Sequence, residues 1–449
     1  MLEMQWIRDH AEKVQELARL KKIDVSVEEL LAADRRKRGL LRKTEALRAA
    51  RNQASRDIGA MLQQTGDAKA AEALKLQVKQ LNLQLNMLES ELEQVEKDME
   101  RLMLLMPNEV SADTPSGQSD ADNVEVKRVG QPPLFDFEAK DHVTLGEMHG
   151  MLDLQRGVKV GGTRNYVLKG AGFMLHRAVQ QLALDLLIAR GFTPMEVPLL
   201  VRREALQHTG FFPLGQDQVY QLEAVDRWLV GTSEVPLVSC FSGEIIDVQE
   251  PMRLAAATTC FRSEVGSAGK DVRGLYRVHQ FAKVEQVILC ENDVELSERL
   301  LQELTDNAER LLELLELPYR VVAVCTGDMS QKTYKQYDIE TWMPSRNAYG
   351  ETHSSSMLLD FQARRANIRY RDARGKLRYC HTLNNTAVAT PRILIPLLEN
   401  RQQADGTVLL PKALRPYMGG LEKLVPADRQ TMGEEGTTSN GEGESNSGY

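Results

Sequence analysis

The feature that most restricts the fold is a regular apolar seam between residues 74 and 106. It consists of Leu74, Val78, Leu81, Leu85, Leu88, Leu92, Val95, Met99, Leu102 and Met106. The alternating steps of four and three residues are the a/d spacing of a heptad repeat and indicate one long helix. A second helical pattern covers about 27–62, and the polar stretch QQTGDA separates the two. The short turn favours an antiparallel helical hairpin over a coiled coil that only dimerises the protein.

The first helix of this hairpin is strongly basic, although the whole chain carries a formal net charge of −8. Its basic residues between 34 and 56 are Arg35, Arg36, Lys37, Arg38, Arg42, Lys43, Arg48, Arg51 and Arg56. A row of charges on a helix is usually a solvated face. A one-sided basic stripe on a projecting arm is also how proteins meet a phosphate backbone, so the pattern alone leaves both interpretations open.

Cysteine and histidine usage excludes several classes of protein. The five cysteines are scattered without a CxxC pair, and the eight histidines show no HExxH pattern. This argues against a disulfide framework or a zinc site and fits a reducing compartment. The N-terminus lacks the apolar run of a secretory signal, and no stretch approaches the roughly 20 apolar residues of a membrane helix. We therefore expect a cytoplasmic protein that does not enter a membrane.

Composition divides the chain into four expected parts. These are a helical arm over 1–106, a linker over 107–133, a body over 134–420 and a disordered tail over 421–449. The linker is rich in Pro, Ser, Asp and Gly, and the tail is poor in hydrophobic residues. In the body, short β-rich runs alternate with helices such as 171–191 and 293–316. This predicts an α+β fold with a largely antiparallel sheet. The expected strands include the runs 227–238, 258–266, 281–290, 319–327, 356–362 and 366–372.

The stretch FRSEVGSAGKDVRGLYRVHQFAKVE (261–285) concentrates positive charge around a glycine-rich turn. We expect two strands joined by the loop GSAGKD, with Arg262 and Glu264 on one face of the first. Phe281, Lys283 and Glu285 then share one face of the second. Guanidinium groups suit phosphate oxygens, and an exposed phenyl ring suits a flat base. A surface hairpin with incidental ion pairs is the alternative, but crowded charges of one sign favour an anionic ligand.

No phosphate-binding loop of the common kinds is present, because the chain has neither GxxxxGK[ST] nor a GxGxxG after a strand. Instead, 261–285 resembles motif 2 of the seryl-tRNA synthetases, a class II aminoacyl-tRNA synthetase family of bacterial type. Further ordered segments are similar to that family. They are the basic arm, GFTPMEVPLLV (191–201, motif 1), GTSEVPL (231–237, serine recognition), NAYGETHSSSMLLDFQARRANIRYRD (347–372, ATP and metal), HTLNNTAVATPRILIPLLEN (381–400, motif 3) and LRPYMGG (414–420).

The resemblance implies a two-step reaction. Serine's carboxylate attacks the α-phosphate of ATP, giving seryl-adenylate and pyrophosphate, and the terminal ribose hydroxyl of tRNA(Ser) then attacks the mixed anhydride. It also implies a class II antiparallel β-sheet core flanked by helices, with the helical hairpin as a tRNA-binding arm. Catalysis of this kind needs positioning and charge neutralisation, without a protein nucleophile. The expected cofactors are ATP and Mg²⁺, and the expected catalytic residues are Arg262, Arg277 and Arg392.

Other roles carry over by the same resemblance. ATP binding falls to Arg262, Ser263, Glu264, Arg277, Val278, Phe281, Glu351, Thr352, His353, Ser354 and Arg392. Glu351 and Ser354 are the expected metal contacts, and L-serine binding falls to Thr232, Ser233, Glu234, Arg262, Glu285 and Thr386. The expected tRNA-binding residues are Arg35, Arg36, Arg38, Arg42 and Lys43.

The family also implies a homodimer, with motif 1 and Pro198 at its interface. Whether selenocysteine tRNA is a second substrate stays open. One alternative is a catalytically altered paralogue that binds tRNA or serves a specialised role, which loss of motif arginines would indicate. Another is a ligase that loads an amino acid onto a carrier protein, but those relatives lack the long arm. A coiled-coil scaffold would leave residues 170–420 unexplained.

Overall fold

The computed structural model describes residues 1–64, 68–265 and 273–428. The chain forms two compact units that meet in the sequence between Glu109 and Val110. The predicted glycine-rich loop GSAGKD (266–271) and Gly66 of the hairpin turn lie outside the described residues. Among the described residues, no helix is long and apolar enough to cross a membrane.

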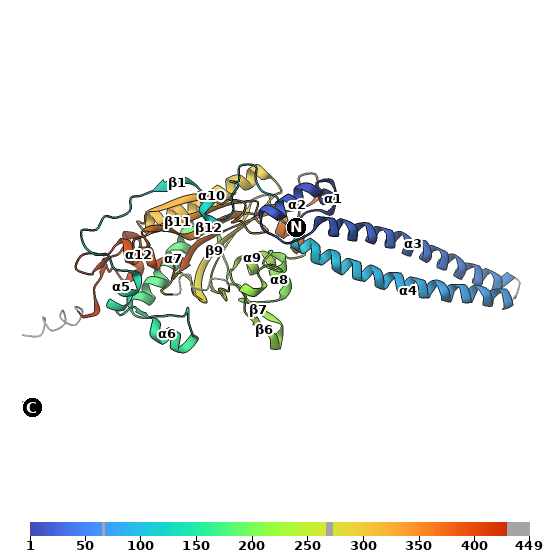
Figure 1. Cartoon of the computed structure of the whole chain (residues 1–449), viewed down its shortest axis with the longest axis horizontal. Coiled ribbons are helices and arrows are strands. Elements are labelled where there is room, and N and C mark those ends of the chain that lie inside the picture. Colours follow the sequence, from blue (N-terminus) through green and yellow to red (C-terminus); the bar gives the residue numbers. More distant parts are fainter. Residues whose placement is uncertain (65–67, 266–272, 429–449) are drawn as a thin grey trace, which may run out of the picture. The chain divides into compact units, whose positions relative to one another are not determined.

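The N-terminal unit is the predicted helical hairpin. It contains α1 (Met4–Asp9), α2 (Ala11–Leu20), α3 (Val27–Gln64) and α4 (Ala68–Leu105). The two long helices run side by side (Figure 1). The apolar seam of α4 turns inward, with Leu85, Val95 and Leu102 at most 5% exposed, so the heptad assignment is confirmed. At the base of the hairpin, α1 and α2 bury Ile7 and Val14 against the lower end of the seam.

The C-terminal unit is built on an eight-stranded sheet in the order β1-β10-β11-β12-β15-β9-β8-β4. Every neighbouring pair is antiparallel except β4 with β8. This confirms the predicted, largely antiparallel α+β core. The strands are β1 (Val124–Val129), β4 (Thr193–Pro194), β8 (Met252–Phe261), β9 (Gln280–Cys290), β10 (Tyr319–Ala323), β11 (Lys335–Met343), β12 (Ala348–Met357) and β15 (His381–Thr390).

The remaining elements of this unit are short apart from two helices. The helices are α5 (His142–Met148), α6 (Leu154–Gly161), α7 (Ala171–Ala189), α8 (Arg203–His208), α9 (Glu234–Ser239), α10 (Val294–Leu314), α11 (Phe361–Ala366) and α12 (Leu394–Asn400). The minor strands are β2 (Leu152–Asp153), β3 (Val167–Leu168), β5 (Leu200–Val201), β6 (Gln221–Leu222), β7 (Arg227–Leu229), β13 (Arg369–Arg371), β14 (Leu377–Tyr379), β16 (Val408–Leu409) and β17 (Lys423–Leu424).

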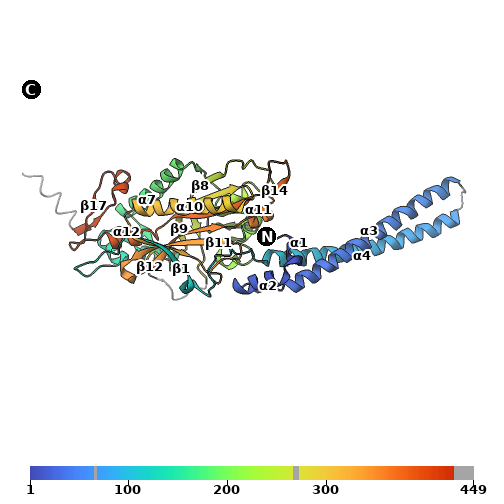
Figure 2. The same ribbon diagram turned by 90° about the horizontal axis from the view of Figure 1, so that it is seen from above.

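Helices cover both faces of the sheet, and β9 shows how the sequence divides between them. Helices α7 and α10 lie along the sheet (Figure 2), and Val284 and Ile288 of β9 belong to the main core that these helices form with it. Val287 and Leu289 point to the other face and pack against α9 and α11. Because side chains alternate along a strand, Phe281, Lys283 and Glu285 belong to this second face.

The structure corrects four expectations. The run 227–238 is strand only at β7 and then turns into α9, and 356–362 leaves β12 after Met357 and starts α11. Local β propensity is outweighed there by packing, since both helices bury apolar side chains under the sheet. The predicted linker contains β1, which pairs with β10 at the sheet edge. The predicted disordered tail begins with β17, which pairs with β16.

Candidate active site

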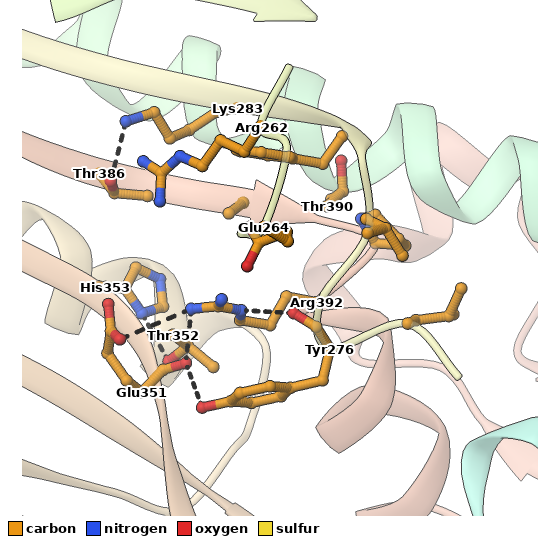
Figure 3. Close-up of a pocket in the computed structure, with 15 residues that line it drawn as sticks. Arg262, Glu264, Tyr276, Lys283, Glu351, Thr352, His353, Thr386, Thr390 and Arg392 are labelled. Carbon is orange, nitrogen blue, oxygen red and sulfur yellow. Dashed lines mark hydrogen bonds and ion pairs between the residues drawn. The ribbon is translucent and has the colours of Figure 1, made fainter. Parts of the chain in front are cut away.

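A cleft opens on the second face of the sheet, to which Lys283 belongs, and Figure 3 shows its lining side chains. It holds about 530 Å³ of empty space, part of which is open solvent. The lining residues come from the end of β8, from 275–281, and from β9, β12 and β15. They are Arg262, Glu264, Leu275, Tyr276, Val278, Phe281, Lys283, Glu351, Thr352, His353, Thr386, Ala389, Thr390, Pro391 and Arg392.

Arg262 and Glu264 line the cleft as predicted, but they do not lie on a strand. Strand β8 ends at Phe261, and Glu264 has a left-handed backbone with φ +53°. The expected shared strand face is therefore wrong, and the irregular backbone after β8 aims both side chains. Arg262 donates from Nε to the carbonyl of Gly231 at 3.3 Å, and its guanidinium lies 5.5 Å from the Phe281 ring centroid.

Lys283 is a cleft residue to which the sequence assigned no role. Its Nζ lies 2.5 Å from the Glu285 carboxylate and donates to Thr232 Oγ1 at 2.7 Å and Thr386 Oγ1 at 3.3 Å. The three acceptors are all predicted serine contacts, and the structure brings them together around one ammonium group. The sequence held a signal for this role, because Lys283 lies between Phe281 and Glu285 at a spacing of two residues. This spacing puts all three side chains on one face of β9.

Two other predicted serine contacts, Ser233 and Glu234, lie at the start of α9 and, like Thr232 and Glu285, are not among the residues that line the cleft. Glu234 opens α9, and its carboxylate accepts from Lys332 Nζ at 2.5 Å and Gln362 Nε2 at 2.7 Å. Ser233 is fully buried, as the residue that precedes α9. Neither side chain lines the cleft. Glu234 instead joins α9 to α11, next to the turn that carries Thr232.

Arg392 enters the cleft from the turn between β15 and α12. Its Nε donates to the carbonyl of Tyr276 at 3.2 Å, and one terminal nitrogen donates to the carbonyl of Glu351 at 3.2 Å. Its guanidinium also lies 4.5 Å from the Tyr276 ring centroid. Arg346 lies 4.0 Å from the same centroid, and Tyr276 donates its hydroxyl to the Glu351 carbonyl at 3.3 Å. Tyr276 thus joins motif 2 to motif 3, a role that no sequence motif indicated.

Strand β12 contributes Glu351, Thr352 and His353 to the cleft, and its pairing with β11 is irregular at this point. The register with β11 shifts between Ile339 and Glu340, so Thr352 has no partner of its own across the ladder. Glu351 stays exposed, while Thr352 and His353 are buried. Burial lowers the pKa of His353 to about 3, so its ring is neutral at physiological pH.

A second carboxylate lies behind Glu351. Asp338 on β11 pairs across the ladder with Ser354, and it is only 8% exposed. Burial, reinforced by the negative charge of Glu351, raises the pKa of Asp338 to about 8. Gln336 bridges the pair by donating to Asp338 at 2.9 Å and Ser354 at 3.2 Å. The sequence did not indicate Asp338, because the β11–β12 pairing that brings it here is a tertiary feature.

Three predicted nucleotide contacts, Ser263, Arg277 and Ser354, are not among the residues that line the cleft. Arg277 is 3.5 Å from the Glu264 carboxylate, and Ser263 donates its hydroxyl to the Asp217 carbonyl at 2.5 Å. Val278 does line the cleft, as predicted. Arg277 and Glu264 therefore hold each other at the cleft mouth in this structure.

The five predicted tRNA-binding residues differ in their surroundings on α3. Arg35, Arg36 and Arg38 form ion pairs with Glu28, Glu91 and Asp34 respectively. By contrast, Arg42 and Lys43 are exposed and have no carboxylate within ion-pair distance among the described residues. The basic stripe is partly neutralised at the base of the arm and remains uncompensated at Arg42 and Lys43.

Comparison with known proteins covers nearly the whole chain. Residues 1–110 match the family described as the seryl-tRNA synthetase N-terminal domain. Residues 220–401 match the tRNA synthetase class II core domain (G, H, P, S and T). A serine–tRNA ligase of Deinococcus radiodurans is 46% identical over 425 residues, which are 94% of this chain and 99% of the relative.

Solved structures give the same result. The crystal structure of seryl-tRNA synthetase from Pyrococcus horikoshii, complexed with ATP, superposes with a TM-score of 0.87 at 35% identity and covers 95% of this chain and 100% of that one. The cytoplasmic serine–tRNA ligase from Naegleria fowleri, in complex with AMP, superposes with a TM-score of 0.80 at 28% identity and covers 93% and 96% of the two chains. Both similar structures hold an adenine nucleotide.

Proposed function

The chain belongs to the seryl-tRNA synthetase family, and we propose that its cleft around Arg262, Phe281 and Arg392 is where serine is joined to ATP. The chain acts as a serine–tRNA ligase, an ATP-dependent enzyme that forms seryl-adenylate and then charges tRNA. One observation carries the placement of the reaction. Two guanidinium groups, from the segments that directly follow β8 and β15, line one cleft beside a half-buried phenyl ring.

Each cleft residue has a role that its position supports. Arg262 lies between the serine-side acceptors and the nucleotide and neutralises the α-phosphate while a serine carboxylate oxygen attacks it. Phe281 stacks on the adenine, Glu264 accepts from the adenine amino group, and Arg392 covers the opposite side. Arg277 reaches the terminal phosphates, which requires its ion pair with Glu264 to open when ATP binds.

Serine binds where Lys283 meets its three acceptors. Glu285 and the hydroxyls of Thr232 and Thr386 can hold the substrate's ammonium and hydroxyl groups. Lys283 keeps the buried Glu285 carboxylate compensated when no substrate is present. A pocket that hydrogen-bonds the serine hydroxyl rejects alanine by roughly 10⁴-fold, because its own polar groups would otherwise stay unpaired.

Magnesium fits the residues at the back of the cleft. Glu351 and Ser354 would hold it through hard oxygen atoms, and Asp338, whose pKa is raised to about 8, lies across the ladder from Ser354. Among the described residues, no cluster of three or more His, Cys, Asp or Glu side chains could hold a metal by itself. The ion would therefore share its coordination with ATP phosphates, whose negative charge it neutralises. Thr352 and His353 fix the strand that presents Glu351.

Two surfaces are proposed to bind partners: the arm binds tRNA, and the outer face of α7 binds a second copy of the chain. We assign tRNA(Ser) binding to α3, chiefly through Arg42 and Lys43. We expect α3 to recognise the shape of the tRNA more than the identity of its bases. A homodimer would cover the apolar side chains of Phe173, Met174 and Ile188, which are 51%, 48% and 47% exposed on α7. With motif 1 and Pro198 nearby in the sequence, the expected assembly is a cytoplasmic dimer. No observation favours a catalytically altered paralogue, since Arg262, Arg277 and Arg392 are all present.

The test is serine-dependent ATP–pyrophosphate exchange by Arg262→Ala and a matched control, Arg253→Ala. Arg253 lies on β8, the strand that leads to Arg262, but it pairs with Glu303 of α10 away from the cleft. We expect Arg262→Ala to lose roughly 100-fold or more in kcat/KM, the cost of removing a buried transition-state contact. Arg253→Ala should stay within about threefold of wild type. Near-full exchange by Arg262→Ala with an intact fold would refute the placement of the reaction.

A further inference from the structure

A buried hydrogen-bonded chain links α12, the start of α5 and the segment 274–276 that leads toward β9. Glu399, in the last turn of α12, has a fully buried side chain and accepts from His142 Nδ1 at 2.8 Å. His142 Nε2 in turn accepts from the backbone N–H of Leu275 at 3.2 Å. The two side chains are 257 residues apart in sequence, and neither lines the cleft.

The chemistry of these groups fixes the tautomer of His142. A backbone N–H can only donate, so Nε2 must be the acceptor and the ring proton must sit on Nδ1. That proton faces Glu399, which also accepts from the backbone N–H groups of His142 at 3.0 Å and Ser345 at 2.9 Å. The carboxylate is therefore anchored to the protein body and holds the imidazole in one orientation.

The segment that this chain holds forms part of the nucleotide cleft. Leu275 is 1% exposed and packs in one apolar cluster with Val143 of α5 and Ile395 of α12. The next residue, Tyr276, lines the cleft, and its carbonyl accepts from the Nε of Arg392. A fixed Leu275 backbone therefore fixes Tyr276, and Tyr276 fixes the guanidinium of Arg392.

Gly274 shows how closely this backbone approaches the histidine. Its φ of +92° is a conformation that side-chain-bearing residues rarely adopt. A Cβ at this position would overlap Nε2 of His142 and lie 2.9 Å from its Cε1. Only glycine therefore lets the segment lie against the imidazole.

We infer that His142, oriented by Glu399, is a positioning residue for ATP, because it anchors the segment that places Tyr276 and Arg392 in the cleft. The inference rests on the proposed binding of ATP in this cleft. Because the serine-side residues Thr232, Glu285 and Thr386 lie on other elements, loss of the anchor should weaken ATP binding selectively.

The experiment measures KM for ATP and KM for serine in pyrophosphate exchange by the full-length enzyme with His142→Ala. We expect KM for ATP to rise about tenfold, the usual effect of losing one buried hydrogen bond with its positioning, and KM for serine to stay within about twofold. His149→Ala is the matched control, because His149 directly follows the same helix α5, is buried, and bonds to the Gly406 carbonyl. A purely structural role would lower the melting temperature of both variants and leave both KM values unchanged.

Gly274→Ala disturbs the contact between His142 and the segment 274–276 by changing the segment instead of the histidine. It keeps the inference testable if His142→Ala folds poorly. It should raise KM for ATP by about the same factor, and the double variant should show less than the product of the two effects. A rise below about threefold in both single variants, or an equal rise in His149→Ala, overturns the inference. Arg262→Ala in the same assay separates failure of this inference from failure of the proposed function. If Arg262→Ala loses exchange, the proposed site is supported whatever the result for His142→Ala.

Discussion

The ammonium group of Lys283 lies 2.5 Å from the carboxylate of Glu285, and the two side chains are 6% and 0% exposed. A buried carboxylate that loses the cation it pairs with is left uncompensated, which costs about 3–5 kcal/mol. We therefore expect Lys283→Met to lower the free energy of unfolding by that amount. The fall should appear as a lower melting temperature in thermal unfolding without substrate.

The double variant Lys283→Met/Glu285→Gln is the control for this pair. It removes the uncompensated charge together with the cation, so it should recover part of the lost stability. An identical melting temperature for the single and double variants would show that the fall comes from packing rather than from charge.

Thr386 offers a test of how the enzyme selects serine. Its hydroxyl lies 3.3 Å from the Glu285 carboxylate and 3.3 Å from Lys283 Nζ, on the wall of the cleft. Thr386→Val keeps the shape and removes the hydroxyl, so we expect KM for serine to rise roughly 10–100-fold with KM for ATP unchanged. Thr258→Val, buried on β8 outside the cleft, should leave both constants unchanged. An unaltered KM for serine in Thr386→Val would remove Thr386 from the serine site.

The sequence predicted those parts of the structure that are specified locally. The seam of α4 repeats every seven residues, so its buried face could be read directly from Leu85 and Val95. The alternation along β9 likewise placed Phe281 and Glu285 on one face. Motif resemblance then placed Arg262 and Arg392 in a single cleft, although about 130 residues separate them.

The remaining features depend on contacts between distant segments. The end of β8 at Phe261 and the left-handed backbone of Glu264 are set by the surrounding turn, and alternation does not predict them. Asp338 reaches the proposed metal contacts only through the register of β11 with β12. His142 meets Glu399 because α5 and α12 pack together, and no local pattern indicates that.

Stability of the arm base should depend on acid pH through Asp34. Arg8, which donates to this buried carboxylate at 2.8 Å, lowers the pKa of Asp34 below its ordinary value. Because the folded-state pKa is the lower one, the stabilisation is complete above the unfolded value of about 4 and disappears as pH falls below it. We expect Asp34→Asn to expose the amides of α1 and α3 to faster hydrogen exchange at pH 7. The difference from wild type should shrink as pH falls below the unfolded value, and a constant difference would exclude the ion pair as its source.

The arm itself can be shortened without touching the cleft. Arg48 on α3 pairs with Glu89 on α4 at 2.8 Å, so replacing residues 49–88 by a short glycine turn closes the hairpin at that level. We expect pyrophosphate exchange within about twofold of wild type and tRNA charging reduced by roughly 100-fold or more, because the proposed role of the arm is to contact the phosphate backbone of tRNA. In the full-length chain, Arg42→Gln/Lys43→Gln should weaken tRNA binding and flatten its salt dependence by about one unit of slope per lost contact. The matched variant Arg36→Gln, whose partner is Glu91, should change the slope less. Unchanged charging by the shortened arm would refute its assignment to tRNA.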